Sequence, residues 1–236
     1  MIYVSPNHKF GLEEELLIKI QIDNALDFGW DTKDIILATN FEYEFKGVRS
    51  VVVPDNNYCH FRPLSTKSVT VSYLLANEMV EPDQVYWVHD LDAYQADNIE
   101  MSLDNCVAAF SDYGWQRKWS LGSYFFNHKA NLLLGQLKET ICHNRQEDER
   151  ALIYLTDRNV GNINSLYKKI NVTYNFGMRK IAYTYSIAEK PLRVLHFHPF
   201  KRGTEQLRKF MYGENDLNQV LMPENLIKIF NNYGIK

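Results

Sequence analysis

Two carboxylates one residue apart, Asp90 and Asp92, follow directly after the apolar segment 85–88. Side chains alternate between the two faces of a strand, so residues i and i+2 point the same way. If segment 85–88 is a buried strand, both carboxylates aim at one point beyond its carboxyl end, where open α/β sheets bind ligands. Two oxygen ligands there suit Mg²⁺ or Mn²⁺ shared with a substrate phosphate. Because Asp-x-Asp is also common in solvated turns, the pair needs support from the rest of the chain.

A second group of such residues lies near the C-terminus, in segment 194–202. His196 and His198 alternate along a predicted strand, so both face one side and either can complete a metal site with the acidic pair. Lys201 and Arg202 follow and are suited to holding phosphates. The alternative is that these are ordinary core or surface histidines.

The charge of the chain is unevenly distributed. Residues 179–209 hold eight Lys and Arg against two Glu, a net charge of +6 in a chain whose total is −3. A basic stretch in an acidic protein indicates a polyanionic ligand, such as a diphosphate or a nucleic-acid backbone, or else a solvated basic surface.

Composition and length indicate one soluble globular domain. The 236 residues are 45% hydrophobic and 23% charged, with no apolar run long enough to cross a membrane and no signal peptide pattern. The three cysteines are widely spaced, which is typical of a reducing compartment. We therefore predict a cytoplasmic protein without an integral membrane segment.

Helical and strand periodicities alternate along the chain, which predicts an α/β fold with a mostly parallel central sheet flanked by helices. The expected domain covers residues 1–202, with a C-terminal helical appendage of the same domain over 203–236. Helices are expected at 12–28, 66–80, 129–142, 147–155, 204–211 and 223–230. Strands are expected at 2–4, 34–39, 48–53, 85–88, 105–110, 123–127, 170–174 and 194–197.

Three segments together resemble the metal-dependent nucleotide-sugar glycosyltransferases of the GT-A fold, most nearly the family-8 type with its DxD motif. They are the helix with Thr70-Val71-Ser72-Tyr73-Leu74-Leu75 leading through Pro82 to the acidic pair, the segment Asn171-Val172-Thr173-Tyr174-Asn175-Phe176, and the segment Val194-Leu195-His196-Phe197-His198-Pro199-Phe200-Lys201. The resemblance implies a GT-A-like (Rossmann-like) domain and an enzyme of the EC 2.4 type. It further implies a nucleoside-diphosphate sugar donor, with UDP the favoured nucleotide, a sugar or glycan acceptor, and Mn²⁺ or Mg²⁺. It favours His196 as the histidine ligand and implies a phosphate contact for Lys201.

Further site residues follow from the expected fold. Tyr3 and Ser5 at the end of the first strand, and Thr39 and Asn40 at the end of the second, lie where a nucleoside binds in such sheets. Lys67 lies at the start of a helix whose N-terminus could face the base.

Two further groups are candidates for the sugar sites. Asp148 and Glu149, at a helix start, are candidates for a catalytic base or for holding donor-sugar hydroxyls, although acidic residues there also compensate the helix dipole. Trp115, Trp119 and Tyr124 could stack on an acceptor sugar or pack in the core.

Other functions remain open at this point. The basic stretch allows a glycosyltransferase acting on modified bases in DNA, or a non-enzymatic nucleic-acid-binding module. A non-enzymatic sugar-binding domain is a further alternative. A sugar-phosphate nucleotidylyltransferase would need a glycine-rich loop after the first strand, whereas segment 5–11 has one glycine. The sugar, the acceptor, the stereochemical outcome and the oligomeric state are not encoded in any recognisable motif.

Overall fold

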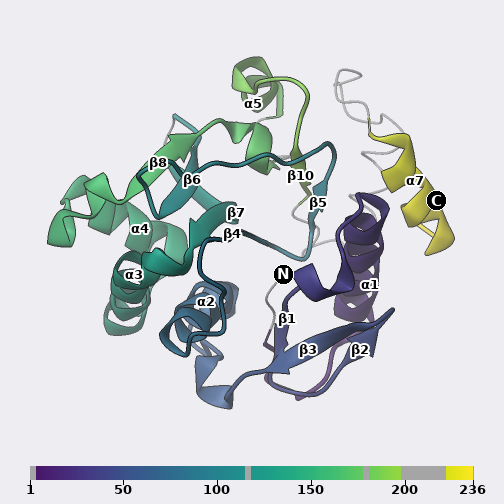
Figure 1. Cartoon of the computed structure of the whole chain (residues 1–236), viewed down its shortest axis with the longest axis horizontal. Helices are drawn as coiled ribbons and strands as arrows, with labels where there is room; N and C mark the ends of the chain where they lie inside the picture. The colour runs from purple at the N-terminus through teal and green to yellow at the C-terminus, as the bar shows by residue number, and fades with distance from the viewer. Residues whose placement is uncertain (1–3, 115–117, 178–180, 198–221, 236) are drawn as a thin grey trace.

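The structure is a computed structural model that describes residues 4–114, 118–177, 181–197 and 222–235 (Figure 1). Several predictions fall outside the described residues: the helix at 204–211, most of the strand at 2–4, and the site residues Tyr3, Trp115, His198, Lys201 and Arg202.

The helices follow the hydrophobic periodicity of the sequence. They are α1 (Leu12–Asp27), α2 (Thr66–Ala76), α3 (Asn131–Asn144), α4 (Asp148–Asp157), α5 (Ile181–Ile187) and α7 (Glu224–Asn232). The helices predicted at 12–28, 66–80, 129–142, 147–155 and 223–230 are confirmed, whereas α5 was not predicted. Helix α2 ends four residues early, because the Asn77 amide donates to the carbonyl oxygen of Tyr73 and Glu78 takes a left-handed φ of 54°.

The described strands form three small sheets. Their orders are β1-β3-β2, β4-β7-β6-β8 and β5-β10-β9. The strands are β1 (Leu37–Thr39), β2 (Glu44–Phe45), β3 (Val48–Val52), β4 (Val85–His89), β5 (Ala93–Gln95), β6 (Ala108–Asp112), β7 (Trp119–Asn127), β8 (Tyr167–Ile170), β9 (Phe176–Gly177) and β10 (Val194–His196).

The α/β class is confirmed, but the sheets are mixed rather than mostly parallel. Strand pairs β1/β3, β6/β8 and β9/β10 are parallel, and β2/β3, β4/β7, β6/β7 and β5/β10 are antiparallel. For the pair β6/β7, the reason is that β7 starts at Trp119, four residues before the predicted strand at 123–127. The connection from β6 is therefore short, and a short connection makes the pair antiparallel.

The strand predicted at 170–174 is wrong. Strand β8 ends at Ile170, and Val172–Asn175 form a 3₁₀ turn. The side chain of Asn171 accepts a hydrogen bond from the backbone nitrogen of Thr173 at 2.9 Å, which favours a turn over an extended segment.

Two hydrophobic clusters lie on either side of the segment that joins β4 to β5. The first fills the space between the four-stranded sheet and helices α2, α3 and α4. Trp119 and Tyr124 belong to it and are fully buried, so the interpretation that they stack on an acceptor sugar is wrong. The second joins α1 and α7, which lie side by side in Figure 1, to Tyr94 of β5 and to Phe197.

Among the described residues, every helix is too short or too polar to span a lipid bilayer.

Candidate metal centre

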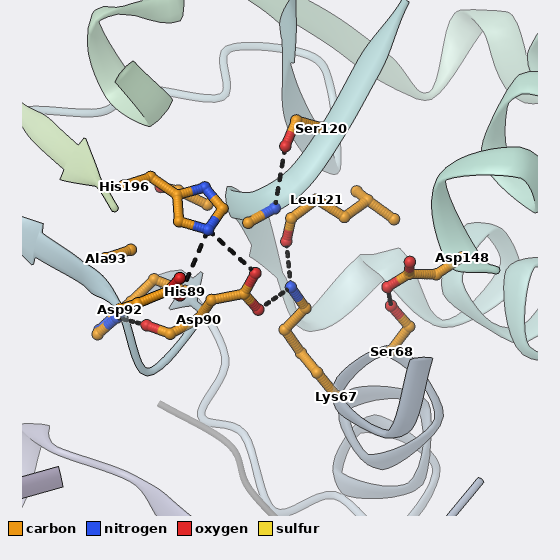
Figure 2. Close-up of polar contacts among 12 residues, drawn as sticks. Lys67, Ser68, His89, Asp90, Asp92, Ala93, Ser120, Leu121, Asp148 and His196 are labelled. Carbon is orange, nitrogen blue, oxygen red and sulfur yellow. Dashed lines mark hydrogen bonds and ion pairs between the residues drawn. The ribbon is translucent and has the colours of Figure 1, made fainter. Parts of the chain in front are cut away.

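Asp90 and Asp92 are brought together by a turn, not by strand alternation as the sequence suggested. Strand β4 ends at His89, and its burial is partial, with Val88 buried but Val85 exposed. The Asp90 backbone nitrogen donates to the Gly122 oxygen at 2.8 Å, and the Ala93 nitrogen donates back to the Asp90 oxygen at 3.1 Å. The chain thus turns between β4 and β5, and dashed lines in Figure 2 join His196 to both carboxylates.

His196, the last residue of β10, completes the cluster. Strand β10 runs antiparallel to β5, with His196 opposite Ala93, and the nitrogen of Phe197 donates to the Asp92 oxygen at 2.9 Å. The imidazole Nε2 lies 3.4 Å from Oδ2 of Asp90 and 3.4 Å from Oδ1 of Asp92. One ligand atom from each residue lies within 4.8 Å of the other two, so the three can share one cation.

Gly122 of β7 makes room for this imidazole. A Cβ atom at position 122 would lie 2.0 Å from Cε1 and 2.3 Å from Nδ1 of His196. No side chain fits at such distances, so the close approach of β7 to β10 requires glycine here.

Asn175 determines which imidazole nitrogen carries the hydrogen. Its Nδ2 donates to the carbonyl oxygen of Ser120 at 3.1 Å, so its Oδ1 is the atom that faces Nδ1 of His196 at 3.0 Å. An amide oxygen only accepts, so Nδ1 must be the protonated nitrogen. The lone pair of a neutral imidazole then lies on Nε2, which points at the two carboxylates, as in histidines that bind metals.

The three groups perturb one another strongly. Burial by itself lowers the pKa of His196, but Asp92 and Asp90 outweigh it and raise that pKa to about 9. Burial by itself raises the pKa of Asp90, but Lys67 and His196 outweigh it and hold that pKa well below its usual range. Without a cation, the imidazolium therefore supplies the positive charge that lies between the carboxylates.

Asp92 is the strongest sign that a cation belongs here. Its side chain is 1% exposed, and neither carboxylate oxygen accepts a hydrogen bond from any described residue. Without a cation, Asp92 is compensated by the charge of His196 at 3.4 Å, and its two oxygens keep lone pairs that a bound cation can take. The site offers two carboxylate oxygens and one imidazole nitrogen, a donor set that suits a divalent cation.

Lys67 lies against this cluster from the first turn of α2. Its Nζ donates to Oδ1 of Asp90 at 2.5 Å and also to the carbonyl oxygen of Leu121 (Figure 2). Burial by itself lowers the pKa of this amine, but Asp90 and Asp148 outweigh it and raise the pKa above its ordinary value. Lys67, predicted to lie at a helix N-terminus that could face the base, thus has its amine engaged with Asp90 and Leu121.

Asp148 and Glu149 lie at the start of α4, close to the start of α2. Asp148 is 6% exposed, and its Oδ2 accepts from the hydroxyl of Ser68 at 2.8 Å while its Oδ1 accepts from the backbone nitrogen of Glu149 at 2.9 Å. Burial raises the pKa of Asp148 to about 6, in spite of Lys67 and Ser68, which lower it. Glu149 is half-buried, and its charge, after burial, raises the pKa of Tyr113.

The residues predicted to hold a nucleoside differ in whether their hydrogen-bonding groups are already used by the protein. The hydroxyl of Ser5 donates to the Lys9 oxygen at 2.6 Å, and that of Thr39 donates to the Phe41 oxygen, so both serve local turns. The amide nitrogen of Asn40 donates to Asp55 at 3.0 Å, whereas its buried Oδ1 accepts from no described residue. Among the described members of this set, Asn40 is thus the one whose buried amide oxygen is open to a ligand.

Of the predicted basic stretch, the structure describes only residues 181–197. There, Lys190 donates to the carbonyl oxygens of Tyr185 and Ala188, and Arg193 pairs with Asp97 at 3.2 Å. These two cations already have protein partners.

Sequence reasoning missed two residues of the cluster. Asn175 stood in the segment that carries the family resemblance, but nothing in the sequence assigned it a contact. Gly122 had no signal, because the need for glycine arises only when β7 and β10 come together.

The structure is thus a mixed α/β domain in which the acidic pair follows β4, an edge strand of the four-stranded sheet, and His196 at the end of β10 lies beside the pair. Solved structures of glycosyltransferases are similar to this chain and support a GT-A-like fold. The galactosyltransferase LgtC, in complex with donor and acceptor sugar analogs, has 12% identity and a TM-score of 0.54 over 98% of this chain and 99% of that chain. A glycosyltransferase involved in the glycosylation of the major capsid of PBCV-1 has 11% identity and a TM-score of 0.51 over 91% of this chain and 98% of that chain.

The glycosyltransferase GlyE of Streptococcus pneumoniae, in its apo form, has 13% identity and a TM-score of 0.52, over 100% of this chain and 63% of that chain. No family model matches the sequence, and no characterised protein matches it by sequence comparison.

Proposed function

We propose that this chain is a metal-dependent glycosyltransferase that moves a sugar from a nucleoside-diphosphate donor, UDP being the favoured nucleotide, to a sugar or glycan acceptor. The observation that carries the proposal is the cluster of Asp90, Asp92 and His196, in which the buried Asp92 carboxylate accepts a hydrogen bond from none of the described residues. Its occurrence in a GT-A fold supports the same reading.

Oδ2 of Asp90, Oδ1 of Asp92 and Nε2 of His196 would hold Mn²⁺ or Mg²⁺. Such a cation, when bound, neutralises charge that develops on a departing diphosphate. The protein's own part is to present these atoms: Asn175 keeps the Nε2 lone pair of His196 toward the carboxylates, and the turn after β4 holds Asp90 and Asp92. Lys201 and Arg202, which follow His196 in the sequence, are proposed to hold the phosphates.

The remaining contacts are assigned by exposure and hydrogen-bonding capacity. The open acceptor of Asn40 is suited to an N–H group of the base, near the strand end where Tyr3, Ser5 and Thr39 were predicted to act. Glu149 is less buried than Asp148, so it is the carboxylate that we assign to the donor sugar or to proton transfer. Asp148, enclosed by Ser68 and by the start of α4, would hold Glu149 in place.

Similar structures support a sugar substrate for the site. LgtC was solved with donor and acceptor sugar analogs, and this chain covers 99% of its length. We infer that this chain likewise takes a sugar donor and a sugar acceptor.

A thermal-shift screen of nucleoside diphosphates, each with and without Mn²⁺, tests the proposal. A ligand that binds only the folded state raises the melting temperature by mass action. We expect one diphosphate to raise it only when Mn²⁺ is present, and the shift to vanish in Asp92→Ala. The matched control is Asp157→Ala, which removes an exposed carboxylate paired with Lys118 and should keep the shift. No shift for any diphosphate with the wild-type protein would contradict the proposed donor site.

A further inference from the structure

The two oxygens of the Asp90 carboxylate have different partners. Oδ1 accepts from Nζ of Lys67 at 2.5 Å, whereas Oδ2 faces Nε2 of His196 at 3.4 Å, inside the cluster. Figure 2 shows the carboxylate lying between the lysine and the histidine. One oxygen is therefore used by the protein, and one remains for a cation.

The arrangement is held rigidly from one strand. Lys67 also donates to the carbonyl oxygen of Leu121, and the next residue of β7, Gly122, accepts from the backbone nitrogen of Asp90 at 2.8 Å. Strand β7 thus binds both the amine and the backbone of the residue that the amine contacts. Because Lys67 is 7% exposed, water does not readily replace it, and the carboxylate cannot rotate to offer both oxygens to the cluster.

We propose that Lys67 is a positioning residue for the cation: it occupies Oδ1 of Asp90, restricts that carboxylate to one ligand oxygen, and so makes the site favour Mn²⁺ and Mg²⁺ over Ca²⁺. The inference rests on the cation site of the proposed function and adds its selectivity.

The physical reason lies in the coordination that each cation prefers. Ca²⁺ takes six to eight oxygens and often binds carboxylates through both oxygens, whereas Mg²⁺ demands six ligands in a near-ideal octahedron. A carboxylate limited to one oxygen fits the octahedral ion. If Oδ1 of Asp90 is freed, it can act as a seventh ligand, which favours the larger Ca²⁺ ion.

The experiment is a titration of the purified full chain with Mn²⁺, followed by electron paramagnetic resonance of the free ion, and then displacement by Ca²⁺. Lys67→Met keeps the approximate length and removes the donor. We expect the ratio of the Ca²⁺ dissociation constant to the Mn²⁺ dissociation constant to fall about tenfold in this variant, the usual scale for residues that support metal ligands. The control is Lys168→Met, which removes a β8 lysine that pairs with Asp104. It should leave the ratio of the two dissociation constants unchanged.

Thermal unfolding of each variant separates a positioning role from a merely structural one. A structural ion pair would lower the melting temperature and leave the Ca²⁺ to Mn²⁺ ratio within twofold of wild type, and that result would overturn the inference. Should Lys67→Met not fold, Lys67→Gln serves instead, because its amide is one bond too short to reach Oδ1 and the same fall is expected. A wild-type protein that binds no Mn²⁺ overturns the cation site itself, whereas Mn²⁺ binding with an unchanged ratio overturns only the role of Lys67.

Discussion

Cation binding at the cluster should depend steeply on pH, because a cation and a proton compete for Nε2 of His196. Burial alone would lower the pKa of this imidazole, but Asp92 and Asp90 raise it to about 9. At pH 7 the cation-free site therefore holds the proton nearly always. Two pH units below the pKa, displacing that proton costs about 3 kcal/mol, or roughly a hundredfold in affinity.

Mn²⁺ titrations between pH 6.5 and 8.5 measure this effect. We expect the apparent dissociation constant to fall about tenfold per pH unit, since one proton leaves for each cation bound. Calorimetry in two buffers with different ionisation enthalpies should count that proton directly. In His196→Gln the side chain does not titrate, so binding should be weaker and the slope should disappear.

A wild-type affinity that changes less than threefold between pH 7 and 8.5 would refute the reasoning. Either His196 would then not be a ligand, or the two carboxylates would not retain its proton as the 3.4 Å contacts imply.

Two further perturbations test the cluster through stability and packing. The folded-state pKa of His196 is raised from 6.5 to about 9, so its ion pairs stabilise the cation-free protein fully below pH 6.5, and the contribution is lost as the pH rises through 9. Urea unfolding measures this as the decrease in the free energy of unfolding between pH 6.5 and pH 9.5. The decrease should be larger in wild type than in His196→Gln by an amount on the order of 3 kcal/mol. Equal decreases in the two proteins would contradict the role assigned to His196. Gly122→Ala would place a methyl group 2.0 Å from Cε1 of His196, which should cost about 1–3 kcal/mol in urea unfolding and abolish Mn²⁺ binding. Gly135→Ala, where a Cβ meets nothing within 4 Å, should keep binding and gain about 0.5–1 kcal/mol; Mn²⁺ binding by Gly122→Ala at the wild-type level would show that the two strands can separate without cost.

The sequence by itself determined the elements and the kind of chemistry. Helix α1 was predictable because its apolar residues recur at helical spacing and Glu13, Glu14 and Glu15 lie in its first turn. The acidic pair after segment 85–88 and the histidine at the end of segment 194–197 were recognisable because each stands at the end of an apolar run. Local periodicity and residue type carry this information, and no contact between distant segments is needed to read it.

The tertiary structure alone decided how these parts meet. Asp90 and Asp92 converge through a turn that depends on the Gly122 carbonyl, 32 residues further along. Asn175 orients His196 through a hydrogen bond across 21 residues, and Lys67 reaches the Leu121 carbonyl across 54. Alternation and periodicity describe neighbours within one element, whereas these contacts depend on which strands pair and how closely. The direction of β7 and the glycine that lets His196 approach it belong to that second kind of information, and they shape the site more than any motif does.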